Sequence, residues 1–172
     1  KAEMLVEVLP YVNRFRDKII VIKYGGNAMI NEELKKAVMQ DLLLMKSVGM
    51  HPILVHGGGP AINDMLKKLK VESHFEQGLR VTDKETMEIV EMVLAGKVNK
   101  DIVGTLNQIG GKGIGLSGKD GNLIQARKKY LEKNGEKIDI GYVGEVEAVN
   151  KEMLESLIYS GYIPVISSIG MG

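Results

Sequence analysis

The sequence predicts an α/β protein, a three-layer αβα sandwich with a mostly parallel central sheet and β-hairpin insertions. Short runs of apolar, largely β-branched residues recur along the chain. Stretches with apolar residues at helical spacing lie between most of these runs. The runs are apolar at consecutive positions, which is typical of parallel strands that helices cover on both faces.

The first element is a helical arm, predicted for residues 1–17. Apolar residues recur there at the spacing of one helix face: Leu5, Val8, Leu9, Val12 and Phe15. This stripe fits either packing on its own domain or packing on another subunit. The predicted strands follow at 19–22, 52–56, 113–116, 122–126 and 163–167.

The helices predicted between these strands are 31–49, 60–69, 82–110 and 151–161. Asn31 is placed to cap the first of them, and Gly49 to end it. Thr82 and Glu85 have the spacing of a capping box at the start of the third. Residues 117–148 interrupt the alternation with Asp-Gly and Asn-Gly turn signals, so they are predicted to form β-hairpins inserted at one edge of the sheet.

Composition excludes several classes of function. The chain has 172 residues, a formal net charge of +1 and no cysteine. We therefore expect no general attraction to nucleic acid or membrane, no disulfide and no thiolate chemistry. The three histidines lack zinc-ligand spacing, and no run approaches the roughly 18 apolar residues that span a bilayer. No metal site is predicted.

Two glycine-rich turns follow predicted strands, at residues 23–26 and 56–60, and a third strand ends in residues 167–172. In open parallel sheets, ligands bind beyond the carboxyl ends of the strands. Consecutive glycines admit a ligand to the backbone, and the next helix points its positive end at the same place. A fixed cation beside them suits phosphoryl transfer, so Lys23 is either that cation or a solvated lysine at a strand end.

Two further polar residues stand near these turns. Arg80 precedes the third helix and is either a clamp for a substrate carboxylate or a solvated arginine. His56 ends the second strand, and we expect it to be packed rather than to act as a base.

Other glycine motifs lack their required context. Residues 113–118 spell GxGxxG without a following crossover helix, and Asp120 stands where a P-loop needs Ser or Thr. We expect these glycines to serve turns. The HGGGP segment is typical of some esterases, but the chain has no GxSxG nucleophile elbow.

Six segments, taken together and in order, resemble the amino acid kinase family. They are IIVIKYGGNAM, ILVHGGGPAI, GLRVTDKETMEIVEMVLAGKVNK, GLSGKDGNLI, DIGYVGEV and YIPVISSIG. VHGGGP with GLRVT at this separation is specific to members that phosphorylate N-acetyl-L-glutamate. The amino-terminal helix resembles that of members that form ring-like hexamers inhibited by arginine.

The resemblance implies transfer of the γ-phosphoryl group of ATP, with Mg²⁺, to the side-chain carboxylate of N-acetyl-L-glutamate in cytoplasmic arginine biosynthesis. It implies that Lys23 stabilises the transferring group and that Gly26 lies beside the phosphates. Gly58 and Gly59 would donate backbone hydrogen bonds, and Arg80 would hold the α-carboxylate. The 117–148 hairpins would cover the substrate. A homo-oligomer, dimer or hexamer, is expected.

The resemblance also predicts the domain organisation. Residues 1–17 would be the arm and 18–172 the substrate-binding lobe of the amino acid kinase fold, while the ATP-binding lobe is expected to be absent from a chain that looks cut at both ends. The 172 residues alone are therefore expected to be inactive. Alternatives are a sister kinase for carbamate, glutamate or UMP, and a non-catalytic binding or oligomerisation module.

Overall fold

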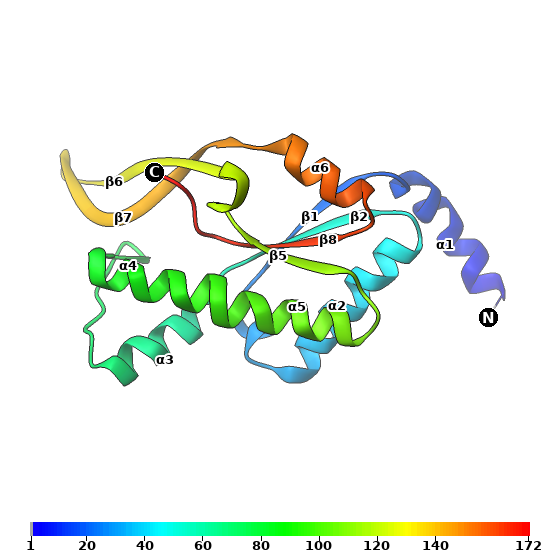
Figure 1. Ribbon diagram of the computed structural model, residues 1–172, viewed down its shortest axis with the longest axis horizontal. Helices are drawn as coiled ribbons and strands as arrows, with labels where there is room; N and C mark the ends of the chain where they lie inside the picture. The colour runs from blue at the N-terminus through cyan, green and yellow to red at the C-terminus, as the bar shows by residue number, and fades with distance from the viewer. Residues whose placement is uncertain (1) are drawn as a thin grey trace.

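The computed structural model describes residues 2–172, with side chains from residue 6 onward except that of Asn27. Its centre is a four-stranded parallel sheet in the order β1-β2-β8-β5 (Figure 1). The strands are β1 (Ile19–Tyr24), β2 (His51–His56), β8 (Ile163–Ser167) and β5 (Gly113–Ser117). All five residues of β8 are buried, as expected for a strand between two parallel neighbours.

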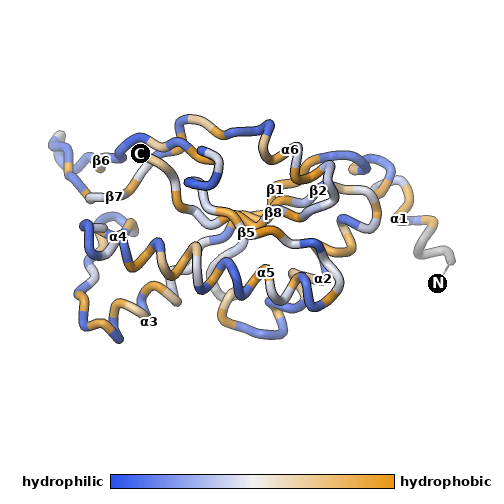
Figure 2. Tube along the Cα trace, viewed as in Figure 1, coloured by the Kyte–Doolittle hydropathy of each residue, from blue (hydrophilic) through white to orange (hydrophobic). Residues whose placement is uncertain are grey.

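Helices cover both faces of this sheet, which confirms the three-layer prediction. On one face lie α2 (Glu32–Ser47), α3 (Gly59–Leu69) and one long helix that runs through α4 (Lys84–Glu91), η2 (Met92–Val98) and α5 (Asn99–Gln108). Their main core centres on Met39, Leu54 and Leu106. The other face carries α6 (Lys151–Tyr159), with a smaller core around Ile158 and Ile166 (Figure 1). Figure 2 shows the hydrophobic trace concentrated in the sheet between these layers.

Helix α1 (Ala2–Phe15) extends from one end of the molecule, beside the start of the sheet (Figure 1). Several of its apolar side chains remain exposed: Val6, Val8, Leu9, Tyr11 and Phe15. Of the predicted stripe, Val8, Leu9 and Phe15 are thus exposed and Val12 is half-buried, while the side chain of Leu5 lies outside the described residues. No helix among the described residues is long and apolar enough to cross a bilayer.

The helix ends follow the predicted caps in one case and not in the other. The side chain of Asn31 accepts hydrogen bonds from the amides of Glu33 and Leu34, and Gly49 lies just beyond α2 with a φ of +88°. The Thr82–Glu85 capping box is wrong, because Asp83 caps α4 instead. The Thr82 backbone pairs with a distant hairpin, so the N-cap lies one residue later than predicted.

Two hairpins complete the fold. The short one pairs β3 (Phe75–Glu76) with β4 (Leu79–Arg80), and the long one pairs β6 (Ile124–Lys133) with β7 (Glu136–Val149). The long hairpin lies at one end of the molecule, beyond the carboxyl edge of the sheet (Figure 1). The predicted hairpin insertion within 117–148 is confirmed.

Of the glycines in the GxGxxG stretch, Gly113 and Gly115 lie within β5 and Gly118 lies in the turn after it, so the expectation that they serve turns holds for Gly118 and is wrong for the other two. None of Gly113, Gly115 and Gly118 has a positive φ. Each instead allows a close approach: a Cβ would lie 3.0 Å from Leu106 at Gly113, 2.0 Å from the Asn99 side chain at Gly115, and 2.1 Å from the Ile169 carbonyl at Gly118. These positions need glycine for packing against the chain itself.

Candidate active site

The carboxyl ends of the sheet strands line up at one edge. Tyr24 lies opposite His56, which lies opposite Ser167, which in turn lies opposite Ser117. The amide of Gly57 donates to the Tyr24 carbonyl at 3.2 Å, so the loops after β1 and β2 leave the sheet side by side. The structure thus brings together the two glycine turns that the sequence singles out.

Lys23 stands at the mouth of the first loop. It lies opposite Val55, whose side chain packs on the core beneath α6, so Lys23 emerges on the α6 face of the sheet. Its Cε lies 4.0 Å from where a Cβ would stand at Gly25, so its side chain runs along the glycine loop. No described carboxylate lies within ion-pair distance of the exposed ammonium, which is therefore open to an anionic ligand.

Gly26 shapes the turn after Lys23. Its φ is +65°, in the left-handed region that glycine adopts without strain, and it opens the 3₁₀ turn η1 (Gly26–Met29). A Cβ there would meet no atom within 4 Å. No other part of the described chain therefore covers the backbone at Gly26 on this side.

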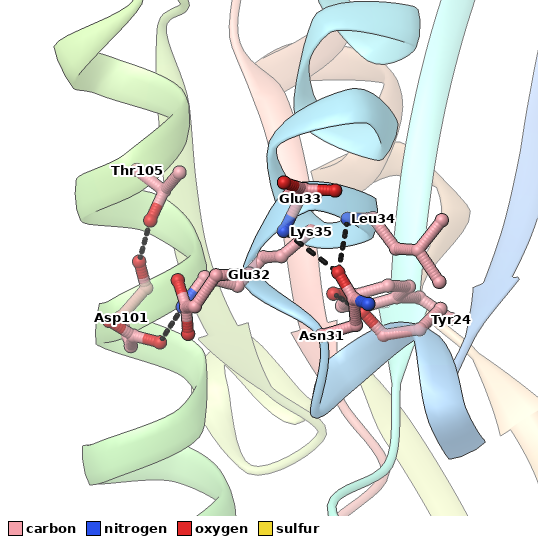
Figure 3. Close-up of polar contacts among 9 residues, drawn as sticks. Tyr24, Asn31, Glu32, Glu33, Leu34, Lys35, Asp101 and Thr105 are labelled. Atoms are coloured by element: carbon pink, nitrogen blue, oxygen red, sulfur yellow. Dashed lines mark hydrogen bonds and ion pairs between the residues drawn. The ribbon is translucent and has the colours of Figure 1, made fainter.

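A buried polar group supports this loop from behind. The Tyr24 hydroxyl donates to the Ala28 carbonyl at 2.8 Å, which closes the loop, and burial raises the pKa of Tyr24. Nearby, Lys35 reaches from α2 to Asp101 on α5, with Nζ 2.8 Å from the carboxylate (Figure 3). A second ion pair joins Lys35 to Glu32 at 3.2 Å.

The ion pairs of Lys35 hold α2 and α5 together beside a cavity. Hydrogen bonding to Asp101 raises the pKa of Lys35, against the effect of burial, so this lysine stays charged at neutral pH. The cavity has a volume of about 440 Å³ and is lined by Tyr24, Met29 and Gly58 among others.

The second loop divides its three glycines between two tasks. Gly58 is buried, and a Cβ there would lie 2.6 Å from Leu94 Cδ2 on the π-helical turn η2. At Gly57 and Gly59 a Cβ would meet nothing within 4 Å, so these residues present open backbone. The sequence predicts that all three glycines let a ligand approach the backbone, but the missing side chain of Gly58 instead allows η2 to pack closely.

The amino terminus of α3 begins in the same loop. Gly58 is the N-cap and makes no side-chain hydrogen bond, and Pro60 has no amide proton. Among the described residues, the amides of Gly58, Gly59 and Ala61 have no acceptor. Free amides and the positive end of the helix dipole together favour an anion at this point.

Arg80 lies beside α3 and is held in place by its neighbours. Its guanidinium donates to the Asn63 side chain on α3 and to the Ser73 hydroxyl, and it stacks on the Phe75 ring at 4.6 Å. Asn63 is one turn from Gly59, so Arg80 lies beside the first turns of α3. Burial lowers the pKa of Arg80. The arginine is therefore not freely solvated.

The long hairpin is anchored directly beside Arg80. Thr82 donates through its amide to the Ile140 carbonyl at 2.9 Å and accepts from the Tyr142 amide at 2.7 Å. Its hydroxyl donates to the Arg80 carbonyl at 2.9 Å. Gly141 has a φ of +77°, and a Cβ there would lie 1.9 Å from the Thr82 carbonyl oxygen. The hairpin and the Arg80 segment therefore meet in one tightly fitted joint.

Sequence reasoning missed the residues that support this site. Asn63, Ser73 and Phe75 hold Arg80, and buried Asn99 contacts His56. Their pairings join segments far apart in the chain, so no local pattern signals them. His56 itself is 1% exposed, as expected for a packed residue. Among the described residues there is no cluster of three or more potential metal-binding side chains.

The chain is similar to known proteins in both sequence and structure. Residues 18–172 match the amino acid kinase family. Acetylglutamate kinase of Caldicellulosiruptor bescii is 61% identical over 172 residues, which cover 100% of this chain and 59% of that protein. Acetylglutamate kinase of Moorella thermoacetica is 58% identical over 176 residues, covering 100% of this chain and 60% of that protein.

A solved structure, that of smu.665 from Streptococcus mutans, matches with a TM-score of 0.74 and 32% sequence identity. The match covers 87% of this chain and 58% of that chain. The chain thus spans about three fifths of the length of the curated relatives it matches.

Proposed function

Because the chain belongs to the amino acid kinase family, we propose that the protein transfers the γ-phosphoryl group of ATP to the side-chain carboxylate of N-acetyl-L-glutamate. The acetylglutamate kinases that align with the whole chain support this substrate. We place the step in arginine biosynthesis in the cytoplasm. Within the protein, residues 18–172 are the lobe that binds the amino acid, and residues 1–17 are an arm.

The observation that carries the proposal is the edge where two glycine loops, a helix amino terminus and Lys23 lie together. In the reaction, a carboxylate oxygen of the substrate forms a bond to the γ-phosphorus while the bond from that phosphorus to the bridging oxygen of ADP breaks. Little covalent help is needed, but negative charge must be neutralised and the reactants aligned. A cation and free amides on rigid elements meet those requirements.

Each proposed site residue has a distinct role. Lys23 brings its ammonium to the transferring phosphoryl group, where negative charge shifts in the transition state. The backbone at Gly26 lets the phosphates approach the first loop. The amides of Gly58 and Gly59 donate to phosphoryl and substrate oxygens at the start of α3.

Arg80 holds the α-carboxylate of the amino acid. A guanidinium binds a carboxylate through two parallel hydrogen bonds. The stack on Phe75 and the contact with Asn63 fix the plane of the Arg80 guanidinium before the carboxylate binds. The long hairpin, joined to Arg80 through Thr82, is positioned to cover the bound amino acid. Magnesium enters as the complex with ATP, and we assign it no ligand from this lobe.

We further propose that the full-length protein is a homo-oligomer, either a dimer or a hexamer. The exposed apolar stripe of α1 supports this, because a stripe at helical spacing gains stability only when another surface covers it. Size-exclusion chromatography with light scattering would measure the mass of the particle.

A substrate panel tests the proposed reaction. The full-length protein is incubated with Mg²⁺-ATP and, in separate reactions, N-acetyl-L-glutamate, L-glutamate, carbamate or UMP. Acyl phosphate is trapped with hydroxylamine, and ADP is measured in parallel. We expect hydroxamate only with N-acetyl-L-glutamate. Turnover with another member of the panel would reassign the substrate, and binding of N-acetyl-L-glutamate without turnover would favour a non-catalytic module.

The same assay on the 172-residue chain separates the lobe from the whole protein. We expect little or no turnover, because the relatives are longer than this chain. Detectable ATP-dependent acyl phosphate from the 172 residues alone would contradict the assignment of this segment as one lobe of the enzyme.

A further inference from the structure

Asn99 lies at the centre of the molecule, where the long helix crosses the carboxyl ends of three strands. It is 0% exposed. Its amide nitrogen donates to the Val165 carbonyl on β8 at 2.9 Å and lies 3.0 Å from His56 Nε2 on β2. A longer contact of 3.4 Å reaches the Leu116 carbonyl on β5. Because all of these hydrogen bonds must be satisfied at once, the buried side chain is held in a single orientation.

The orientation of the Asn99 amide follows from its partners. If oxygen and nitrogen were exchanged, the oxygen would face the carbonyls of Val165 and Leu116, both of which are acceptors. The ammonium of Lys100 also contacts the Asn99 oxygen at 3.2 Å, as a donor should. The nitrogen therefore faces His56, and His56 Nε2 must accept.

This contact determines where the imidazole carries its proton. With Nε2 accepting, the neutral ring is protonated on Nδ1. Nδ1 lies 2.8 Å from the Gly57 carbonyl oxygen and donates to it. The two contacts independently require the same tautomer, and together they hold the Gly57 carbonyl toward the buried ring.

The direction of this carbonyl determines that of the next amide. The peptide bonds are trans and planar, so the amide of Gly58 points opposite to the carbonyl of Gly57. It therefore points away from the buried imidazole, and among the described residues it has no acceptor. Gly57 has no side chain that could hold its peptide in place by other means.

We propose that Asn99 and His56 are positioning residues that aim the Gly58 amide at the oxygens of the bound phosphoryl group or substrate. The chain of contacts runs from Asn99 through the His56 ring to the Gly57 carbonyl, and across the rigid peptide to the Gly58 amide. Neither side chain touches the reactants. This inference rests on the proposed function of the glycine loop.

The GxGxxG stretch contributes to the same device. A Cβ at Gly115 would lie 2.0 Å from Asn99 Oδ1 and 2.8 Å from Lys100 Nζ. Glycine is required there because the Asn99 amide occupies that space. The motif thus supports an anion-binding loop elsewhere in the fold without contacting the anion itself.

The pairing requires a neutral His56. A proton on Nε2 would face the Asn99 amide hydrogen, donor against donor. Burial lowers the pKa of His56, against an opposing hydrogen bond to the Gly57 carbonyl, so the ring is neutral at pH 7. The titratable groups that face the pair are Tyr24 on β1, which is the register neighbour of His56, and Lys100 on α5.

The tautomer can be measured in the wild-type full-length protein. Imidazole ¹⁵N chemical shifts should show His56 protonated on Nδ1, with a pKa below the usual value of a histidine side chain. An Nε2-protonated ring, or a cationic His56 at pH 7, would overturn the proposal. This measurement needs neither turnover nor a substituted protein.

The variant Asn99→Asp tests the effect on catalysis. A carboxylate at this position accepts from Nε2–H and so favours a cationic His56. We expect kcat to fall about 10- to 100-fold at pH 7, somewhat less than removal of a whole anion-binding donor. The acid limb of the pH–rate profile should move to higher pH together with the His56 titration. A merely structural role would leave that limb in place.

Asn107→Asp is the matched control, since it adds the same charge at an exposed position of the same helix. It should leave both kcat and the acid limb unchanged. If the wild-type enzyme is active and Asn99→Asp has the same acid limb as the wild type, this inference is overturned and the proposed function stands. A wild-type protein without turnover would overturn the proposed function itself, and this inference with it.

Discussion

Alanine at Gly58 and at Gly59 should have opposite effects, although the two glycines are adjacent. At Gly58 the new Cβ would lie 2.6 Å from Leu94 Cδ2 and 3.3 Å from Val98 Cγ2, in a buried contact with η2. The Gly58 φ of 173° lies outside the left-handed region, so the predicted penalty is the crowding of this contact. Forcing a methyl group into a packed core costs about 1–3 kcal/mol, and Gly58→Ala should lower the free energy of unfolding by that amount.

Gly59→Ala should leave stability intact and impair function. A Cβ at Gly59 meets nothing within 4 Å, and Gly59 is the first residue of α3. Exchange of glycine for alanine in a helix contributes roughly 0.5–1 kcal/mol, so stability should be unchanged or slightly higher. The methyl group would instead occupy the space beside the free amides, and kcat/KM should fall.

Two assays on full-length variants separate these outcomes. Urea unfolding followed by circular dichroism reports stability, and the coupled ADP assay reports kcat/KM. The reasoning would be refuted by the reverse pattern, in which Gly59→Ala unfolds more easily and Gly58→Ala keeps wild-type stability. Equal effects of the two substitutions on both readouts would also refute the division of tasks within the loop.

Three further predictions concern the groups around the loops. Arg80→Ala should raise KM for the amino acid about 10- to 100-fold with kcat little changed, since a charge-assisted hydrogen bond contributes about 1.5–3 kcal/mol; an unchanged KM in the steady-state assay would remove Arg80 from the site. Gly141→Ala should also raise that KM, because its Cβ would lie 1.9 Å from the Thr82 carbonyl oxygen and would force the hairpin joint apart; limited proteolysis of the hairpin should accelerate in parallel. Burial lowers the pKa of His56 in the folded protein, so its contribution to stability is complete above the pKa of about 6.5 in the unfolded chain and is lost as the pH falls below that value. The midpoint of urea unfolding should therefore drop at acid pH in the wild type, and it should drop less in His56→Gln.

The sequence predicted the sheet and its two glycine loops because those features depend on local patterns. The apolar run of β2 and the glycines after it belong to one continuous segment, and parallel topology then places the ends of all strands at one edge. The cap at Asn31 was predictable for the same reason, since a cap involves only neighbours in the chain.

Features that depend on distant pairing were missed or misread. Thr82 has the sequence of an N-cap, but its backbone pairs with Ile140 and Tyr142, so the cap moves to Asp83. The π-helical turn η2 lies inside a segment whose apolar spacing predicts one continuous α-helix, and its packing against Gly58 is likewise not visible in the local sequence.

The contacts of two asparagine side chains are not indicated by the sequence. Asn99 and Asn63 are polar residues inside ordinary helices, and their sequence neighbours do not indicate what they contact. In the fold, Asn99 meets three strands and Asn63 meets Arg80. Their roles arise from the tertiary structure, which brings together segments that the sequence keeps apart.

The central claim is that Lys23 supplies the charge that stabilises the transferring phosphoryl group. The most direct measurement is kcat of the full-length Lys23→Ala variant with N-acetyl-L-glutamate and Mg²⁺-ATP. We predict a fall of about 100-fold or more with KM for the amino acid little changed, since the interaction strengthens in the transition state. A wild-type kcat in this variant would contradict the claim.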